Sequence, residues 1–405
     1  MCSGATTGYS VKSWRTVVYA VGVAGLGTTP VWLLSAFAPQ IGEALGFDSV
    51  GLGLIIGSFF AVSAITGLTS GRIVASLGWR NGIVLSALSA ALSMGAIALF
   101  THNWVVLVLM LALGAVANSI SQPAANLAVA SAVTHGRQGL ALGIKQAAIP
   151  IATFLVGVSV PLFERGSDWR LAFAAAACMA LLLVLVTGTP RRRALLNWQT
   201  GGVATLRRHL AASSPRNSST GPVPHALVLL AAGAGFGTAA TMSLGGFLVV
   251  YAVDRGLTLS ESGRLLAVGS AVGILSRVLS GYLADLRGRR HLIVVAAMML
   301  VGSVGLCILA FADGLPMLVA GTVLAFGLGW AWFGVFDLSV VRYSAGSPAV
   351  ATGVAMTAMS LGAMIGPVAF GLAAAWSYSA AWLGCAVALV VGAGFMLVGR
   401  RELSR

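Results

Sequence analysis

Long apolar stretches with almost no charge recur along the whole chain, and they constrain its fold more than any other feature. Hydrophobic residues make up 58% of the 405 positions and charged residues 8%, which excludes an ordinary soluble globular domain. A helix needs about 20 apolar residues to cross the hydrocarbon core of a bilayer. Twelve stretches of that kind occur, at residues 16–41, 49–71, 81–101, 104–131, 139–163, 169–188, 225–250, 262–284, 291–312, 316–341, 350–376 and 379–400. We therefore expect an all-α membrane protein with twelve transmembrane helices in two sets of six.

Charge alternates between the segments that join the predicted spans. If the N-terminus is cytoplasmic, the segments on that side carry eighteen lysines and arginines, and the segments on the other side carry four cations beside seven acids. Because cytoplasmic loops are enriched in Lys and Arg, this asymmetry predicts a multi-pass protein of the cytoplasmic (inner) membrane with both termini in the cytoplasm. The net charge of +14 follows from this topology, so it indicates no nucleic-acid partner.

The two sets of six spans are related by an internal repeat. A shift of 210 residues superposes AGLGT at 24–28 on AGFGT at 234–238. The same shift superposes Ser70, Gly71, Gly78 and Arg80 on Ser280, Gly281, Gly288 and Arg290. Residues 189–224 are interpreted as a cytoplasmic linker between an N-terminal bundle (1–188) and a C-terminal bundle (225–405). Repeats of six spans are typical of transporters whose substrate site lies near the bilayer midplane, where the halves meet.

One loop motif makes a family resemblance specific. GYLADLRGRR at 281–290 resembles the Gly-x-Leu-Ala-Asp-x-x-Gly-Arg-Arg loop of the major facilitator superfamily, and GRIVASLGWR at 71–80 resembles a degenerate copy with Ala75 in place of the acid. With twelve spans and a central linker, the likeness covers nearly the whole chain. It implies two pseudo-symmetric six-helix bundles and a secondary transporter, either symporter or antiporter, that works by alternating access and is not an enzyme.

Two cations lie inside predicted spans, Lys145 on the fifth and Arg277 on the eighth, and the repeat duplicates neither. Lys145 corresponds to Ala355 and Arg277 to Gly67. Each lies about 12 Å from the cytoplasmic end of its helix at 1.5 Å per residue, and in the resembling family these two helices meet between the halves. A charge at mid-helix costs at least about 2.5–3.5 kcal/mol on insertion scales, so we interpret both as counter-ions of an anionic substrate. Two alternatives stay open: Lys145 snorkels toward the headgroups, and Arg277 caps helix carbonyls.

Asp337 is an acid of the tenth span, and its counterpart in the N-terminal half is Asn126. The resemblance implies that an acid at this place clamps a loop arginine and so affects conformational balance. The candidate conformational clamp comprises Asp285, Arg289, Arg290, Asp337, Gly281, Gly288, Gly71 and Arg80. A second role for Asp337, as a proton carrier or as the partner of Lys145, stays open.

Aromatic and amide side chains complete the candidate substrate site. GWAWFGVFD at 329–337 puts Trp330 and Phe333 on the tenth span, which lines the cavity in the resembling family. Aromatic walls suit a carboxylate with an apolar body. The polar candidates on the first, fourth and fifth spans are Thr28, Asn118, Gln122 and Gln146. Such aromatic clusters also serve as packing and small polar residues as helix contacts, so both interpretations stay open.

The leading hypothesis is a transporter of a small organic anion, and the rival is a pump that exchanges protons for drugs or metabolites. Pumps of that branch usually carry Gly-x-x-x-Gly-Pro on the fifth helix, where this chain has Lys145, Ile149 and Pro150. We expect a small-molecule substrate, a monomer in the lipid bilayer, and neither cofactor nor metal. Proton coupling stays open, with Asp337 and Lys145 as the groups that could titrate within the membrane.

Overall fold

The computed structural model describes residues 11–132, 143–164, 168–188, 224–287, 291–343 and 348–403. Within these ranges all the regular elements are helical, and twelve helical segments are long and apolar enough to cross a membrane. Each of the twelve overlaps one predicted span, which confirms the predicted fold class. The linker predicted between the halves lies outside the described residues, except for its last residue, Pro224.

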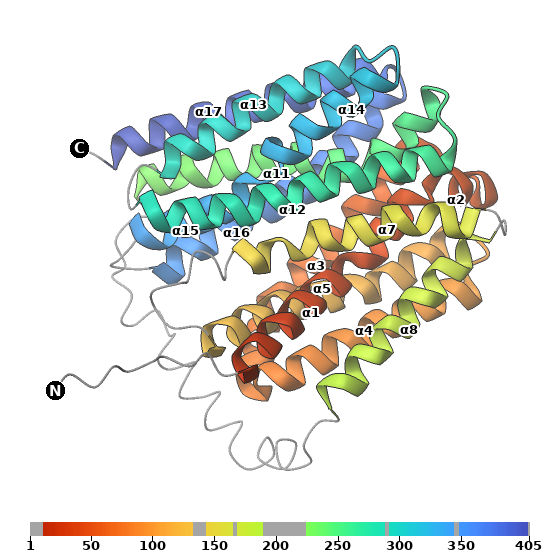
Figure 1. The fold of residues 1–405 in the computed structure, drawn as a ribbon, viewed down its shortest axis with the longest axis horizontal. Coiled ribbons are helices and arrows are strands. Elements are labelled where there is room, and N and C mark those ends of the chain that lie inside the picture. Colours follow the sequence, from red (N-terminus) through yellow and green to blue (C-terminus); the bar gives the residue numbers. More distant parts are fainter. Residues whose placement is uncertain are drawn as a thin grey trace.

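The N-terminal bundle is drawn from red to lime in Figure 1, and the C-terminal bundle from green to blue. The first consists of α1 (Val11–Ala36), α2 (Ala38–Leu45), α3 (Ser49–Leu77), α4 (Trp79–Phe100), α5 (Trp104–Ala132), α7 (Ala148–Glu164) and α8 (Trp169–Thr187). The second consists of α11 (His225–Asp254), α12 (Leu259–Arg287), α13 (His291–Ala310), α14 (Leu315–Leu324), η3 (Ala325–Gly329), α15 (Trp332–Tyr343), α16 (Pro348–Ala374) and α17 (Tyr378–Glu402). Apolar spans form helices because lipid offers no hydrogen-bond partner to backbone N–H and C=O groups, and a helix pairs these groups within the same segment.

Equivalent helices pack in the same way in both bundles. In the first, α4 packs on α5 and α8, and α1 packs on α7. In the second, α13 packs on α14 and α17, and α11 packs on α16. The 210-residue repeat seen in the sequence is therefore a repeat of structure, with two similar six-span units.

Three predicted spans are interrupted within the described residues, the fifth by a turn at Ala147 just before α7. The first span ends at Ala36, and α2 follows as a separate short helix with Pro39 in its first turn. Proline has no N–H to donate to the carbonyl one turn earlier, so the hydrogen bonding of the first helix does not continue through Pro39. The tenth span is divided into α14, the π-helix η3 and α15. Gly327 and Gly329, which have low helix propensity, lie in η3. Such π segments often occur at functional sites.

The two bundles meet most extensively along two helix pairs. α7 packs on α12, and a hydroxyl contact at 2.8 Å joins Thr153 to Ser270 within this interface. Close to that contact, a Cβ on Gly157 would lie 2.7 Å from the carbonyl oxygen of Gly263. The helices thus touch through their backbones, and Gly157 permits the approach.

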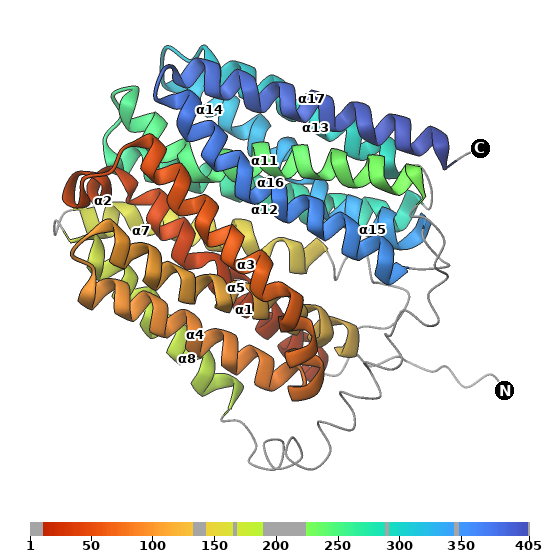
Figure 2. The ribbon, with the colours of Figure 1, turned by 180° about the vertical axis from the view of Figure 1, so that it is seen from behind.

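The second pair, α3 and α16, is in contact at one end and apart at the other. Near Gly57, a Cβ would lie 2.8 Å from the carbonyl oxygen of Met364. Toward the end where α1 begins and α17 ends, a Cβ on Gly67 or on Gly353 would meet no atom within 4 Å. Figure 2 shows α3 and α16 diverging in this direction. We call this end the terminal end and the other the opposite end.

Candidate functional site

Lys145 lies in a helical turn at residues 143–146, which precedes α7 and belongs to the fifth span. Its side chain is 6% exposed. The ammonium Nζ donates a hydrogen bond to Oε1 of Gln122 on α5 at 2.7 Å. The ammonium therefore lies inside the protein, which disagrees with the snorkelling alternative.

Arg277 lies on α12 and is 2% exposed. Its Nη1 donates to the backbone carbonyl of Gln146 across the interface between the bundles, and its Nη2 donates to the carbonyl of Trp330 at 2.9 Å. The Trp330 residue lies at the interruption between η3 and α15, where a carbonyl is free from regular helical bonding. These two bonds agree with the capping alternative. The guanidinium Nε has no hydrogen-bond partner in the described part of the chain, so one buried donor remains.

Two aromatic rings lie against the guanidinium of Arg277. Its Cζ is 5.5 Å from the ring centroid of Trp330 and 5.6 Å from that of Phe333, within the range of cation–π attraction. Both aromatic rings are buried. The predicted residues Arg277, Trp330 and Phe333 are thus brought into one group by α12 and the tenth span.

Gln146 connects this group to the other half of the molecule. Its side-chain Nε2 donates to Oδ2 of Asp337 on α15, while its backbone carbonyl accepts from Arg277. Gly334, one turn before Asp337, lies beside the Gln146 side chain, and a Cβ there would make ordinary van der Waals contact with it at 3.9 Å. One residue of the N-terminal half therefore holds two elements of the C-terminal half.

Electrostatic interactions couple three ionisable side chains here. The half-buried carboxylate of Asp337 attracts both Lys145 and Arg277, and the two cations repel each other. Among the described residues, neither cation forms a direct ion pair with Asp337. Counted by residue type, two basic side chains and one acidic side chain give a formal charge of +1 at the junction of the bundles. We call Lys145, Gln146, Arg277 and Asp337 the charged cluster.

A tryptophan pair lies next to the charged cluster, at the contact between the bundles. The indole rings of Trp32 on α1 and Trp330 make an edge-to-face contact with centroids 5.6 Å apart. Gly245 on α11 permits this contact, because a Cβ there would lie 2.8 Å from Trp32 and 2.9 Å from Trp330. Both indole N–H groups are buried and have no partner among the described residues.

The remaining polar candidates differ in their surroundings. Asn118 donates to Ser63 at 2.8 Å while its buried Oδ1 accepts no hydrogen bond in the described part of the chain. The hydroxyl of Thr28 donates a hydrogen bond to the backbone carbonyl of Gly25 in its own helix, at 2.9 Å. This bond is typical of a residue with a packing role. Gln122 is brought to the charged cluster by its bond to Lys145.

The candidate clamp residues are only partly described. Gly71 is exposed, and a Cβ built there would meet no atom within 4 Å. Gly281, in contrast, is buried and packs on Gly143. The Arg80 guanidinium lies 5.1 Å from the ring centroid of Trp79. The side chain of Asp285 and the whole of Gly288, Arg289 and Arg290 lie outside the described residues. The hydrogen bond that the structure describes for Asp337 comes from Gln146, so its roles as clamp, proton carrier and partner of Lys145 all stay open.

Sequence reasoning missed Trp32, Gly245 and the bridging role of Gln146. Trp32 had a visible signal, a tryptophan inside the first span, but tryptophans inside spans also serve in packing. Gly245 had no visible signal, because nothing in the sequence distinguishes it from the other glycines among the 52 of the chain. The contact of Gln146 with Asp337 joins residues 191 positions apart and depends on how two separate bundles dock.

The sequence model of the Major Facilitator Superfamily matches residues 20–367. Among solved structures, a D-xylose-proton symporter aligns with a TM-score of 0.73 and 15% identity, over 96% of this chain and 97% of that one. A bacterial homologue of the human lysosomal transporter Spinster, inward-facing and unoccupied, aligns with a TM-score of 0.65 and 16% identity, over 98% and 97%. No curated protein sequence matches the chain. At these identities the two structures support the fold alone.

Proposed function

This chain belongs to the Major Facilitator Superfamily, and we propose that it is a secondary transporter of a small organic anion with a carboxylate-like charge and an apolar body. The superfamily is one of transporters, and the described part of this chain holds twelve helices long and apolar enough to span a membrane. What the substrate is must be argued from the residues between the bundles, because the fold is shared by carriers of many compounds.

The observation that carries the proposal is the excess positive charge of the charged cluster. Lys145 and Arg277 are 6% and 2% exposed, and Asp337 compensates only one of their two charges. A buried charge without a full partner is costly, and one bound carboxylate would neutralise the cluster. The free Nε of Arg277 supports the same proposal, since a carboxylate accepts two parallel bonds from a guanidinium.

The tryptophan pair and Phe333 supply apolar surface beside the charge. We propose that Trp330 and Phe333 contact the body of the substrate while Lys145 and Arg277 hold its anionic group. The single excess charge favours a monocarboxylate over a dicarboxylate, because a second negative charge would be buried without a partner.

The proposed transport cycle is alternating access. In the conformation described here α3 and α16 touch near Gly57 and diverge toward Gly67 and Gly353, so we propose that the site opens at the terminal end. The opposite conformation would close α3 on α16 there and separate them near Gly57. From the charge asymmetry of the loops we assign the terminal end to the cytoplasm.

Asp337 favours coupling to protons. Protonation of its carboxylate would raise the formal charge of the cluster from +1 to +2, counting Lys145 and Arg277 as charged. Anion binding would then be tighter at low pH, and the anion and the proton would cross together. Asp337 could equally carry the proton in an exchange for a drug or metabolite. Proton-driven efflux of such a compound is therefore the second candidate function.

Transport by purified protein in liposomes tests the proposal. Labelled monocarboxylates, dicarboxylates and cationic drugs are compared, with and without an imposed proton gradient. The proposal predicts uptake of a monocarboxylate with an apolar body, driven by the gradient. Movement of cationic drugs, with no movement of any acid, would contradict it and support the efflux alternative.

A further inference from the structure

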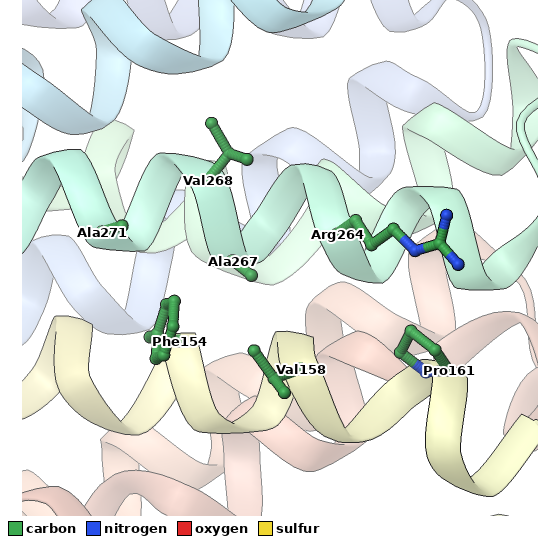
Figure 3. A pocket seen from close by; sticks show the side chains of 7 residues that line it. All are labelled: Phe154, Val158, Pro161, Arg264, Ala267, Val268 and Ala271. Carbon is green, nitrogen blue, oxygen red and sulfur yellow. The ribbon is translucent and has the colours of Figure 1, made fainter.

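A groove on the outside of the α7–α12 interface is separate from the charged cluster. Six of its lining residues are Phe154, Val158, Pro161, Ala267, Val268 and Ala271, and the seventh is Arg264. Figure 3 shows the α7 residues across from Ala267 and Ala271 of α12, with Arg264 at the end of the row nearer to the start of α12. The groove encloses about 460 Å³ and is open to the surroundings of the protein, since Val158 and Val268 are 43% and 44% exposed.

Arg264 is the feature that distinguishes this groove from ordinary lipid-facing surface. It lies five residues after the start of α12, so about 7.5 Å from the end of the span, a depth from which a long side chain reaches the headgroups. It is exposed and makes no hydrogen bond or ion pair within the residues the structure describes.

The two acids nearest to it in the sequence and in the interface are already engaged. Glu261 accepts from the backbone N–H and the hydroxyl of Thr258, and it attracts Arg264 electrostatically without a direct ion pair among the described residues. Glu164 accepts from Ser260. The other described arginines at the opposite end also have contacts. Arg170 lies near Asp168 and over Trp169, and Arg255 lies over Tyr251.

We propose that this groove binds an anionic phospholipid, with an acyl chain along the apolar lining and the phosphate on Arg264. The lining is complementary to a hydrocarbon chain, and a guanidinium at headgroup depth is complementary to a phosphate. Because Phe154 and Val158 belong to one bundle and Arg264 and Ala271 to the other, the bound lipid contacts both halves. The site is independent of the substrate proposed above.

Photolabelling tests this site. Purified protein in nanodiscs receives phosphatidylglycerol or phosphatidylcholine with a diazirine in one acyl chain, and labelled peptides are identified by mass spectrometry. Phosphatidylglycerol is expected to label residues 148–164 and 259–287 more strongly than the other lipid-facing helices. Arg264→Gln should reduce that labelling about fivefold, the effect of one basic residue near a membrane surface, and Arg264→Lys should retain most of it.

Two further variants separate the groove from general lipid contact. Ala271→Leu fills the apolar lining and should reduce labelling by both lipids, whereas Arg255→Gln, an exposed arginine at the same end, should leave it unchanged. Folding of each variant is checked by gel filtration and circular dichroism. Any one of three results would overturn the proposal. These are labelling spread evenly over all exposed helices, labelling unchanged in Arg264→Gln, and equal labelling by the two lipids.

Discussion

The side-chain amide of Gln146 donates a hydrogen bond to the carboxylate of Asp337, 191 positions away and in the other bundle. The backbone carbonyl of the same glutamine accepts from Arg277. The residue next to Lys145 therefore links the two bundles at the place where their charges meet. Any movement of one bundle against the other must break or shift these two bonds.

Gln146→Leu is expected to shift the balance between conformations. A hydrogen bond to a charged group contributes about 1.5–3 kcal/mol, so its loss destabilises the conformation described here. Spin labels at Gly67 and Gly353, which have open space around them, would report the separation of α3 and α16. The shorter-distance population should grow in Gln146→Leu and stay constant in the control Ser159→Ala, whose hydroxyl bonds only within its own helix. An unchanged distribution in Gln146→Leu would contradict the linking role.

Asp337→Asn distinguishes the two roles open to this acid. If Asp337 is part of the charged cluster, the substitution raises the formal charge to +2, so anion binding should tighten and lose its dependence on pH. If Asp337 is only a clamp for a loop arginine, turnover should change while affinity stays close to normal. Equilibrium binding of the anion across a range of pH measures this. Affinity equal to that of the parent at every pH would refute the cluster role.

A crosslink at the opposite end should stop transport. In a background without native cysteines, Gly57→Cys and Val368→Cys place sulfur atoms in close contact, because a Cβ on Gly57 would lie 2.6 Å from the Val368 side chain. Oxidation would hold α3 against α16, and alternating access requires them to separate there. Transport should fall on oxidation and recover on reduction. Full transport by the crosslinked protein would rule out this movement.

Gly245→Ala is expected to destabilise the contact between the bundles. The added methyl group would meet Trp32 and Trp330 at 2.8 and 2.9 Å, and forced overpacking of this kind costs about 1–3 kcal/mol. The melting temperature in detergent should fall. Gly394→Ala is the matched control, because its Cβ would meet no atom within 4 Å, and it should be neutral or slightly stabilising. Equal melting temperatures for both variants would argue against a tight tryptophan pair.

The spans and the buried cations could be predicted because composition and charge act locally along the chain. Apolar length determines what crosses a bilayer, and a lysine such as Lys145 inside a span is visible in the sequence alone. The partners of those cations could not be predicted. The bonds of Arg277 depend on the docking of two bundles and on the interruption at Trp330, where a carbonyl is freed. The low helix propensity of Gly327 and Gly329 did not identify the interruption, because glycines occur throughout the predicted spans.

The central claim is that Lys145 and Arg277 bind the anionic group of the substrate. Equilibrium binding of the transported acid to purified Lys145→Ala and Arg277→Ala tests it most directly, with folding checked by gel filtration. Each variant should lose about 2–5 kcal/mol of binding free energy, the usual effect of removing one partner from a buried charge pair. Lys145→Arg should also bind poorly, because a planar guanidinium cannot replace a compact ammonium beside Gln122. Binding and transport by Lys145→Ala equal to those of the parent would contradict the account.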